Sequence, residues 1–233
     1  NIKGYNLPLG ATNIMTTGKE YDNIYPVWDW TRIPGTTAIG NQDKTSLEGY
    51  QIGNNEFGGG VSDGVNGIIA YKGKYNELQA NKAYFFFDNM FCIGSDISYV
   101  QNDNVLTSVE QNLLNGEVIY NDGQEKQLSS NSNMQLKQLK WVYHNNTGYI
   151  FRGTDNVTIQ NMSQAGSWKD INATGESGLI DKNVFSVWIN HGLNPENASY
   201  QYIVVPDKSI DAFRDLAEQI DLYIAQNDGS VQA

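Results

Sequence analysis

The chain has 233 residues, a length within the range of one large domain with a substantial core. Its 23 glycines, 14 tyrosines and 5 tryptophans, with few long helical periodicities, are typical of strands joined by tight turns. The formal net charge of -11 argues against nucleic-acid binding and repels sulfated glycans at long range. No run of 18 apolar residues predicts a membrane-spanning helix.

Short apolar runs with turn residues between them predict packed antiparallel sheets. Residues 83–87 and 90–94 form one such pair, and the intervening Asp88-Asn89 tolerates left-handed backbone angles, so we expect a hairpin there. Residues 141–144 and 148–151 flank Asn-Asn-Thr at 145–147, which predicts a second hairpin.

The last third of the chain predicts buried strands followed by one helix. Residues 184–190 and 200–205 are apolar on both faces, which is typical of strands lying between two layers. After Pro206, Ser209 is a suitable helix N-cap. Apolar residues then recur at helical spacing as far as Ile224, so we predict a helix of about four turns that ends before residues 227–229.

The residues that most often bind metals or act as nucleophiles are few. Cys92 lies in an apolar run, which favours a buried structural role over a nucleophilic one. His144 and His191 are the only histidines, and their separation does not fit a zinc site. We expect His191, at a strand end, to be a hydrogen-bonding structural residue.

The most informative segment is residues 20–37, with the sequence Glu-Tyr-Asp-Asn-Ile-Tyr-Pro-Val-Trp-Asp-Trp-Thr-Arg-Ile-Pro-Gly-Thr-Thr. It closely resembles the signature of polysaccharide lyase family 8, which includes chondroitin AC, hyaluronate and xanthan lyases. Further blocks in the same order continue the resemblance: residues 57–64, 82–88, 111–116, 144–149, 166–172, 188–192 and 198–206.

The resemblance implies an all-β fold, a large multi-sheet antiparallel β-sandwich with one C-terminal helix. Residues 1–206 would form the central β-sandwich domain, and residues 207–233 a helix and connector toward a further β-domain. In that family the sandwich sits against an N-terminal helical toroid of the same polypeptide, with an acidic polysaccharide in the cleft between them. No nucleic-acid or membrane partner is implied.

The implied reaction is β-elimination on a uronic acid, in which a base removes the proton next to the carboxylate and the glycosidic oxygen departs. The helical domain supplies most of the catalytic groups, and the sandwich supplies an acid and an amide that match Glu20 and Asn23. Glu20 then resembles the carboxylate that orients an Arg and a Tyr of the other domain. Asn23 resembles a contact to the substrate or to that network. Residue type alone instead predicts that Glu20 is a surface acid in a turn.

Three aromatic residues are further candidates for contact with sugar. Trp28 and Trp30 alternate with Asp29 in a strand-like run, which places both on one face. They suit either sugar stacking or, preferably, a core or domain-interface role. Tyr75, in a polar loop at residues 72–76, is expected to be exposed and is a candidate substrate-binding residue.

No cofactor is required by the implied reaction. Some relatives carry calcium in this domain, and Glu56 and Asp63 are candidates for such a site, although their spacing matches no known loop. The resemblance implies a bacterial protein that is secreted or periplasmic. Two alternatives remain open at this point: a noncatalytic carbohydrate-binding or scaffold module of the same fold, and an inactive relative. As the sandwich domain of a lyase, these 233 residues alone are expected to be inactive, because most of the catalytic groups would lie in the helical domain.

Overall fold

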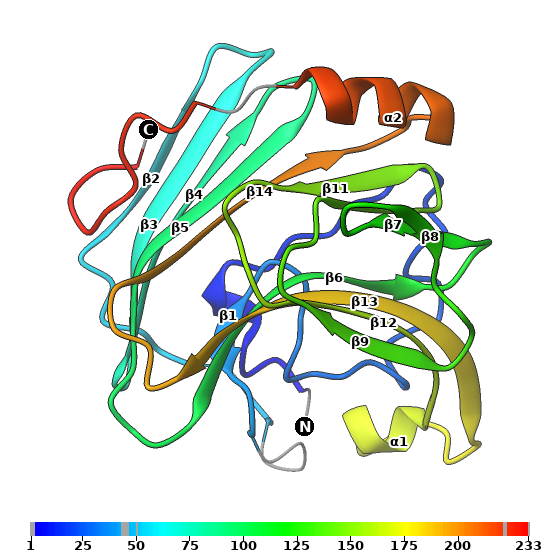
Figure 1. Cartoon of the computed structure of the whole chain (residues 1–233). Coiled ribbons are helices and arrows are strands. Elements are labelled where there is room, and N and C mark those ends of the chain that lie inside the picture. The colour runs from blue at the N-terminus through cyan, green and yellow to red at the C-terminus, as the bar shows by residue number, and fades with distance from the viewer. Residues whose placement is uncertain (1–2, 43–46, 50, 221–222, 233) are drawn as a thin grey trace.

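The computed structural model describes residues 3–42, 47–49, 51–220 and 223–232. They form two antiparallel sheets, of nine and five strands, that pack face to face (Figure 1). The nine-stranded sheet has the order β2 (Phe57–Ser62), β3 (Gly67–Tyr75), β4 (Leu78–Phe86), β5 (Met90–Ser98), β14 (Ala198–Val205), β11 (Thr147–Phe151), β10 (Trp141–His144), β7 (Val118–Asn121), β8 (Glu125–Gln127). The five-stranded sheet has the order β1 (Thr37–Ile39), β6 (Asn104–Leu113), β13 (Ile180–Leu193), β12 (Val157–Gly166), β9 (Ser132–Leu136).

The predicted all-β sandwich is confirmed, and a large shared core explains why its strands are apolar. Side chains from both sheets meet in one cluster that includes Val142, Tyr202, Phe185 and Val187. The helical elements are a 3-10 turn (Leu7–Leu9), α1 (Trp168–Ile171) and α2 (Ile210–Gln219). Of these, the sequence predicted only α2. No helix in the described part of the chain is long and apolar enough to cross a bilayer.

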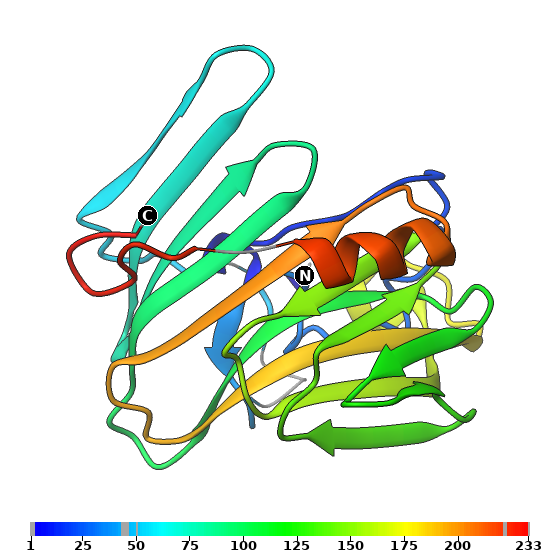
Figure 2. The same cartoon turned by 45° about the horizontal axis from the view of Figure 1, so that its top comes forward.

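Part of the outer face of each sheet is also covered. Strand residues alternate between faces, so Val142 and Tyr202 point into the inter-sheet core while Tyr143 and Ile203 meet α2. Figure 2 shows α2 lying across β14, β11 and β10. On the opposite side, Val184 of β13 packs against the irregular segment that precedes β1. This double cover explains why β13 and β14 are apolar on both faces, as predicted.

The two predicted hairpins are confirmed. β10 and β11 pair directly, and Asn145 and Asn146 adopt left-handed φ angles of 47° and 59°. β4 and β5 also pair as expected. Asp88 and Asn89 are not among the described residues with positive φ, so this turn does not use the left-handed angles that the dipeptide tolerates.

Helix α2 begins as predicted but ends earlier. Ser209 is the N-cap and accepts a hydrogen bond from the Ala212 amide. The helix stops at Gln219, which is shorter than the predicted four turns; residues 221–222 of the predicted helix lie outside the described residues. Phe213 and Ala217 pack on the sheet, whereas Tyr223 is exposed. Short helices depend on such packing, so α2 ends where its contact with the sheet ends.

The chain beyond α2 returns to the nine-stranded sheet. The Ser95 hydroxyl donates to the Asp228 carbonyl at 2.7 Å, and Asn227 Nδ2 donates to the Gly94 carbonyl at 3.0 Å. The role of residues 207–233 as a connector to another domain stays a prediction.

The contact between β11 and α2 leaves no room for a side chain at Gly148. A Cβ atom there would overlap the Phe213 ring. We expect Gly148→Ala to destabilise the chain by about 1–3 kcal/mol, as other overpacking changes do. Urea unfolding measures this. Gly178→Ala is the matched control, because nothing lies within 4 Å of a Cβ at that position. Equal midpoints for the two variants would contradict the packing described here.

Candidate functional site

The segment at residues 20–34 lies on the outer face of the five-stranded sheet as a series of turns. Tyr21, Ile24 and Trp28 are buried against Val184 of β13. The strand-like run predicted for residues 27–30 is therefore wrong. The rings of Trp28 and Trp30 nevertheless lie together, with centroids 5.3 Å apart in an edge-to-face arrangement. Trp28 is buried, which agrees with the core or interface role that the sequence favoured.

Strand β6 holds this segment in place through hydrogen bonds. Its Gln111 side chain accepts from the Asp29 amide at 2.7 Å and donates to the carbonyls of Asp29 and Arg32 at 3.1 and 2.9 Å. The Trp28 indole donates to the Gln111 carbonyl at 2.9 Å. At the end of β6, the Leu113 amide donates to the Glu20 carbonyl at 2.9 Å. These hydrogen bonds to β6 fix the position of residues 20–34, which have no regular secondary structure of their own.

Glu20 is buried, with 4% of its surface exposed, and its two carboxylate oxygens have different surroundings. Oε1 accepts four hydrogen bonds: from the Thr16 and Thr17 amides at 3.1 and 2.7 Å, and from both hydroxyls at 2.9 Å. Oε2 is buried and has no hydrogen-bond partner among the described residues. Burial raises the pKa of Glu20, but these hydrogen bonds outweigh it and lower the pKa to about 2. The carboxylate is therefore charged at neutral pH.

The two threonines that hold Glu20 were missed at the level of sequence. A signal was present, because Thr17-Gly18-Lys19-Glu20 has the spacing of a capping box, in which the acid accepts from the backbone amide of the threonine. The Thr17 amide makes this contact with Glu20, although no helix follows.

Asn23 lies in the same turn as Glu20 and is exposed. Its φ of 52° is in the left-handed region that asparagine tolerates. Its Oδ1 accepts a hydrogen bond from the Trp168 indole of α1 at 3.0 Å. Its Nδ2 makes no hydrogen bond among the described residues, so it remains a donor for an external group.

Tyr75 does not have the exposed position that the sequence suggested. It is 7% exposed, its hydroxyl donates to the Pro8 carbonyl at 2.9 Å, and Asn55 Nδ2 donates to that hydroxyl at 3.1 Å. The expectation of exposure is wrong because the alternation of β3 turns Tyr75 inward, against Leu9 and Ala38. The candidate role of Tyr75 in substrate binding depended on an exposed side chain, and the side chain is buried.

The histidines and the cysteine have structural surroundings. His191 Nε2 shares a hydrogen bond of 2.7 Å with the Thr107 hydroxyl, as expected of a structural histidine. His144 Nε2 accepts from the Asn115 amide at 2.9 Å. Burial lowers the pKa of His144 to about 4 and that of His191 to about 3. Cys92 is fully buried, and burial raises its thiol pKa to about 12.

A metal-binding cluster is absent from the part of the chain that the structure describes. No three His, Cys, Asp or Glu side chains there gather closely enough to hold an ion. Asp63 caps the β2–β3 turn by accepting from the Val65 and Asn66 amides at 2.8 and 2.6 Å. Calcium at Glu56 and Asp63 stays a prediction.

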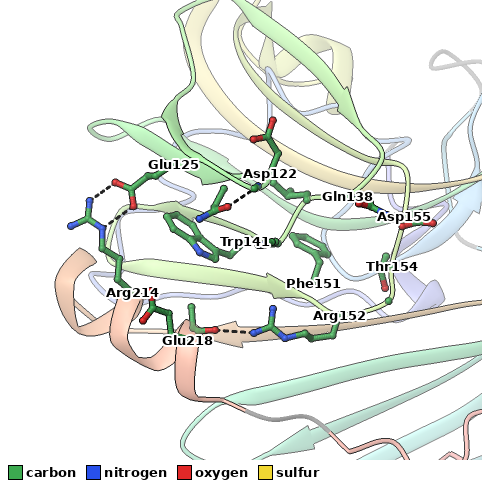
Figure 3. A pocket seen from close by; sticks show the side chains of 16 residues that line it. Asp122, Glu125, Gln138, Trp141, Phe151, Arg152, Thr154, Asp155, Arg214 and Glu218 are labelled. Carbon is green, nitrogen blue, oxygen red and sulfur yellow. Dashed lines mark hydrogen bonds and ion pairs between the residues drawn. The ribbon is translucent and has the colours of Figure 1, made fainter.

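A groove of about 750 Å³ lies between α2 and the strands β7, β8, β10 and β11 (Figure 3). Its lining includes neither Glu20 nor Asn23. Its arginines have partners within the chain. Arg214 forms a bidentate ion pair with Glu125 at 2.6 and 2.9 Å, and Arg152 donates to the Ala217 carbonyl at 2.8 Å. The groove is therefore not the site that the signature segment builds.

Fold and site together define an antiparallel β-sandwich domain. The segment on the outer face of its five-stranded sheet holds the charged Glu20 carboxylate, one oxygen of which has no hydrogen-bond partner among the described residues. The sequence model described as polysaccharide lyase family 8, super-sandwich domain, matches residues 1–217. The chain belongs to this family, as the resemblance of its motifs indicated.

The relatives are considerably longer than this chain. Chondroitinase-AC of Pedobacter heparinus is 42% identical over 210 residues, covering 88% of this chain and 30% of the relative. Xanthan lyase of Bacillus sp. (strain GL1) is 28% identical over 224 residues, covering 90% of this chain and 24% of the relative. Among solved structures, a chondroitinase AC lyase studied with oligosaccharides superposes with a TM-score of 0.89 at 37% identity, covering 100% of this chain and 35% of that one. The chain therefore spans about a third or less of these proteins.

Proposed function

We propose that this chain is the β-sandwich part of a lyase that cleaves a uronic-acid glycan of the chondroitin or hyaluronan type by β-elimination. Glu20 and Asn23 contribute to an active site that a helical domain of the same polypeptide completes. The relatives support the reaction class, since they carry the names of chondroitin, hyaluronate and xanthan lyases. Because the chain spans so little of their length, the activity belongs to the complete polypeptide.

The single observation that carries the proposal is the state of the Glu20 carboxylate. A buried, charged oxygen without a hydrogen-bond partner costs on the order of 1–3 kcal/mol or more, and a docked cation or hydroxyl donor would relieve that cost. An arginine or tyrosine of the missing domain has the right chemistry. Glu20 is thus suited to hold groups of another domain in place.

The low pKa also defines what Glu20 does not do. A general base works best with a pKa near the operating pH, and a carboxylate with a pKa of about 2 is too weak to remove the proton next to a uronate carboxylate. In the elimination, the electrons of that C–H bond form the C=C bond. The C–O bond breaks, and the departing oxygen takes a proton. We assign the base and acid to the missing domain, and a donor role toward the substrate or its carboxylate to Asn23 Nδ2.

The test compares the complete polypeptide with the 233-residue chain on chondroitin and on hyaluronan. Formation of the unsaturated product is followed by its ultraviolet absorbance. We expect product from the complete polypeptide and none from the chain alone. Turnover by the chain alone would overturn the shared-site proposal. Glycan binding by the chain, with no turnover by the complete polypeptide on any uronic-acid glycan, would instead support a noncatalytic carbohydrate-binding module.

A further inference from the structure

Glu110 of β6 is a second buried carboxylate close to the signature segment, and the reaction proposed above does not use it. It is 1% exposed and accepts three hydrogen bonds. Oε1 accepts from the Tyr21 hydroxyl at 2.7 Å and from the Gln111 amide at 2.9 Å, while Oε2 accepts from the Tyr149 hydroxyl at 2.9 Å. All three partners donate, so this arrangement suits the ionised carboxylate.

Tyr21 connects Glu110 to the loop that surrounds the Glu20 carboxylate. The Tyr21 hydroxyl also accepts a hydrogen bond from the Ile14 amide at 3.1 Å. An amide N–H can only donate, so the Tyr21 hydroxyl accepts from Ile14 and donates its own hydrogen bond to Glu110. The loop at residues 14–21 contains Thr16, Thr17 and Glu20. Its two ends, Ile14 and Tyr21, are joined by the hydrogen bond to the Tyr21 hydroxyl.

Three residues further along β6, the Leu113 amide donates to the Glu20 carbonyl, so the strand fixes Glu20 at its backbone as well. The loop that donates four hydrogen bonds to Glu20 thus has a defined position only while Tyr21 is held. We propose that Glu110 is a positioning residue that holds the loop around the Glu20 carboxylate through Tyr21. The catalytic consequence rests on the proposed function, but the positioning itself does not.

A positioning role and a purely electrostatic role of Glu110 predict different results. Burial raises the pKa of Glu110 to about 7, so Glu110 is already neutral at the low pH where Glu20 titrates. A purely electrostatic role therefore predicts that replacing Glu110 leaves the pKa of Glu20 unchanged. Releasing the loop weakens the hydrogen bonds from Thr16 and Thr17, which raises the pKa of Glu20 toward its ordinary value. A rise in the pKa of Glu20 therefore supports the positioning role.

The experiment titrates the Glu20 side-chain carboxyl by ¹³C NMR in the 233-residue chain and in three variants. Wild-type Glu20 should stay ionised down to about pH 3.5. In Glu110→Met, which removes the acceptor of the Tyr21 hydroxyl, and in Tyr21→Phe, the Glu20 midpoint should move above about pH 3.5, and the Thr17 amide should exchange its hydrogen at least about tenfold faster. Tyr149→Phe is the matched control, because it removes the hydroxyl that contacts the other oxygen of Glu110 and does not touch the loop. It should leave the Glu20 midpoint unchanged.

An unchanged or lowered Glu20 midpoint in Glu110→Met and Tyr21→Phe would overturn the positioning role. If Glu110→Met does not fold, Tyr21→Phe decides alone, since it keeps the buried carboxylate and removes only the link. This experiment does not measure turnover. If the positioning role is overturned, the proposed lyase function is therefore unaffected. If the complete polypeptide proves inactive, the positioning result is unaffected.

Discussion

Replacing Glu20 with glutamine in the complete polypeptide is expected to lower kcat by roughly 10²- to 10⁴-fold, the range seen when one orienting or charge-stabilising group is lost from an active site. Glutamine has nearly the same shape and keeps an oxygen for Thr16 and Thr17. It lacks the charge by which, in the shared site proposed above, the unpaired Oε2 would attract a cation of the helical domain.

The Michaelis constant should change much less than kcat, because an orienting group acts mainly on the transition state. Initial rates on chondroitin and hyaluronan, followed by the absorbance of the unsaturated product, separate the two constants. Asp22→Asn is the matched control, since Asp22 is an exposed acid in the same turn. A full rate in Glu20→Gln, or an equal loss in both variants, would remove Glu20 from the mechanism.

Lys82 should give the chain a stability that rises with pH just above neutrality. Its side chain is fully buried in β4, where the ammonium donates to the carbonyls of Leu9, at 3.3 Å, and Gly35. Burial lowers the pKa of Lys82 to about 7, and the nearby Cys92 only partly counteracts this. The unfolded chain, with an ordinary lysine pKa, binds more protons than the folded chain between about pH 7 and pH 10.5. Raising the pH through this window therefore stabilises the folded state.

We expect the contribution of Lys82 to the free energy of unfolding to increase by about 1.5 kcal/mol between pH 7 and pH 8.5. Lys82→Met should abolish this increase. Urea unfolding at both pH values measures this increase in wild type and in the variant. Burial raises the pKa of Glu110 to about 7, so Glu110 also makes a smaller contribution, which cancels when wild type and variant are compared. Lys72→Met, at an exposed lysine of β3, should retain the wild-type increase. The same increase in Lys82→Met would show that Lys82 is not its source.

Local chemistry explains the predictions that succeeded. The Asn145-Asn146 pair tolerates positive φ, and Ser209 satisfies the first free amides of α2, so a hairpin and a helix start were readable from a few adjacent residues. The signature at residues 20–37 and the later blocks identified the family, and the fold followed from the family. Glu20 and Asn23 could be named for the same reason, as matches to a motif.

Turn chemistry, strand periodicity and motifs are carried by residues close together in the chain, so the fold class, the family and two candidate residues could be predicted from the amino-acid sequence. The end of α2, the burial of Tyr75 and the surroundings of Glu20 could be seen only in the folded chain. Each depends on contacts between distant segments: the sheet under Phe213, the Pro8 carbonyl that receives the Tyr75 hydroxyl, and β6 beneath the signature segment. Burial and hydrogen-bond partners arise from which segments pack together, and local sequence does not specify that.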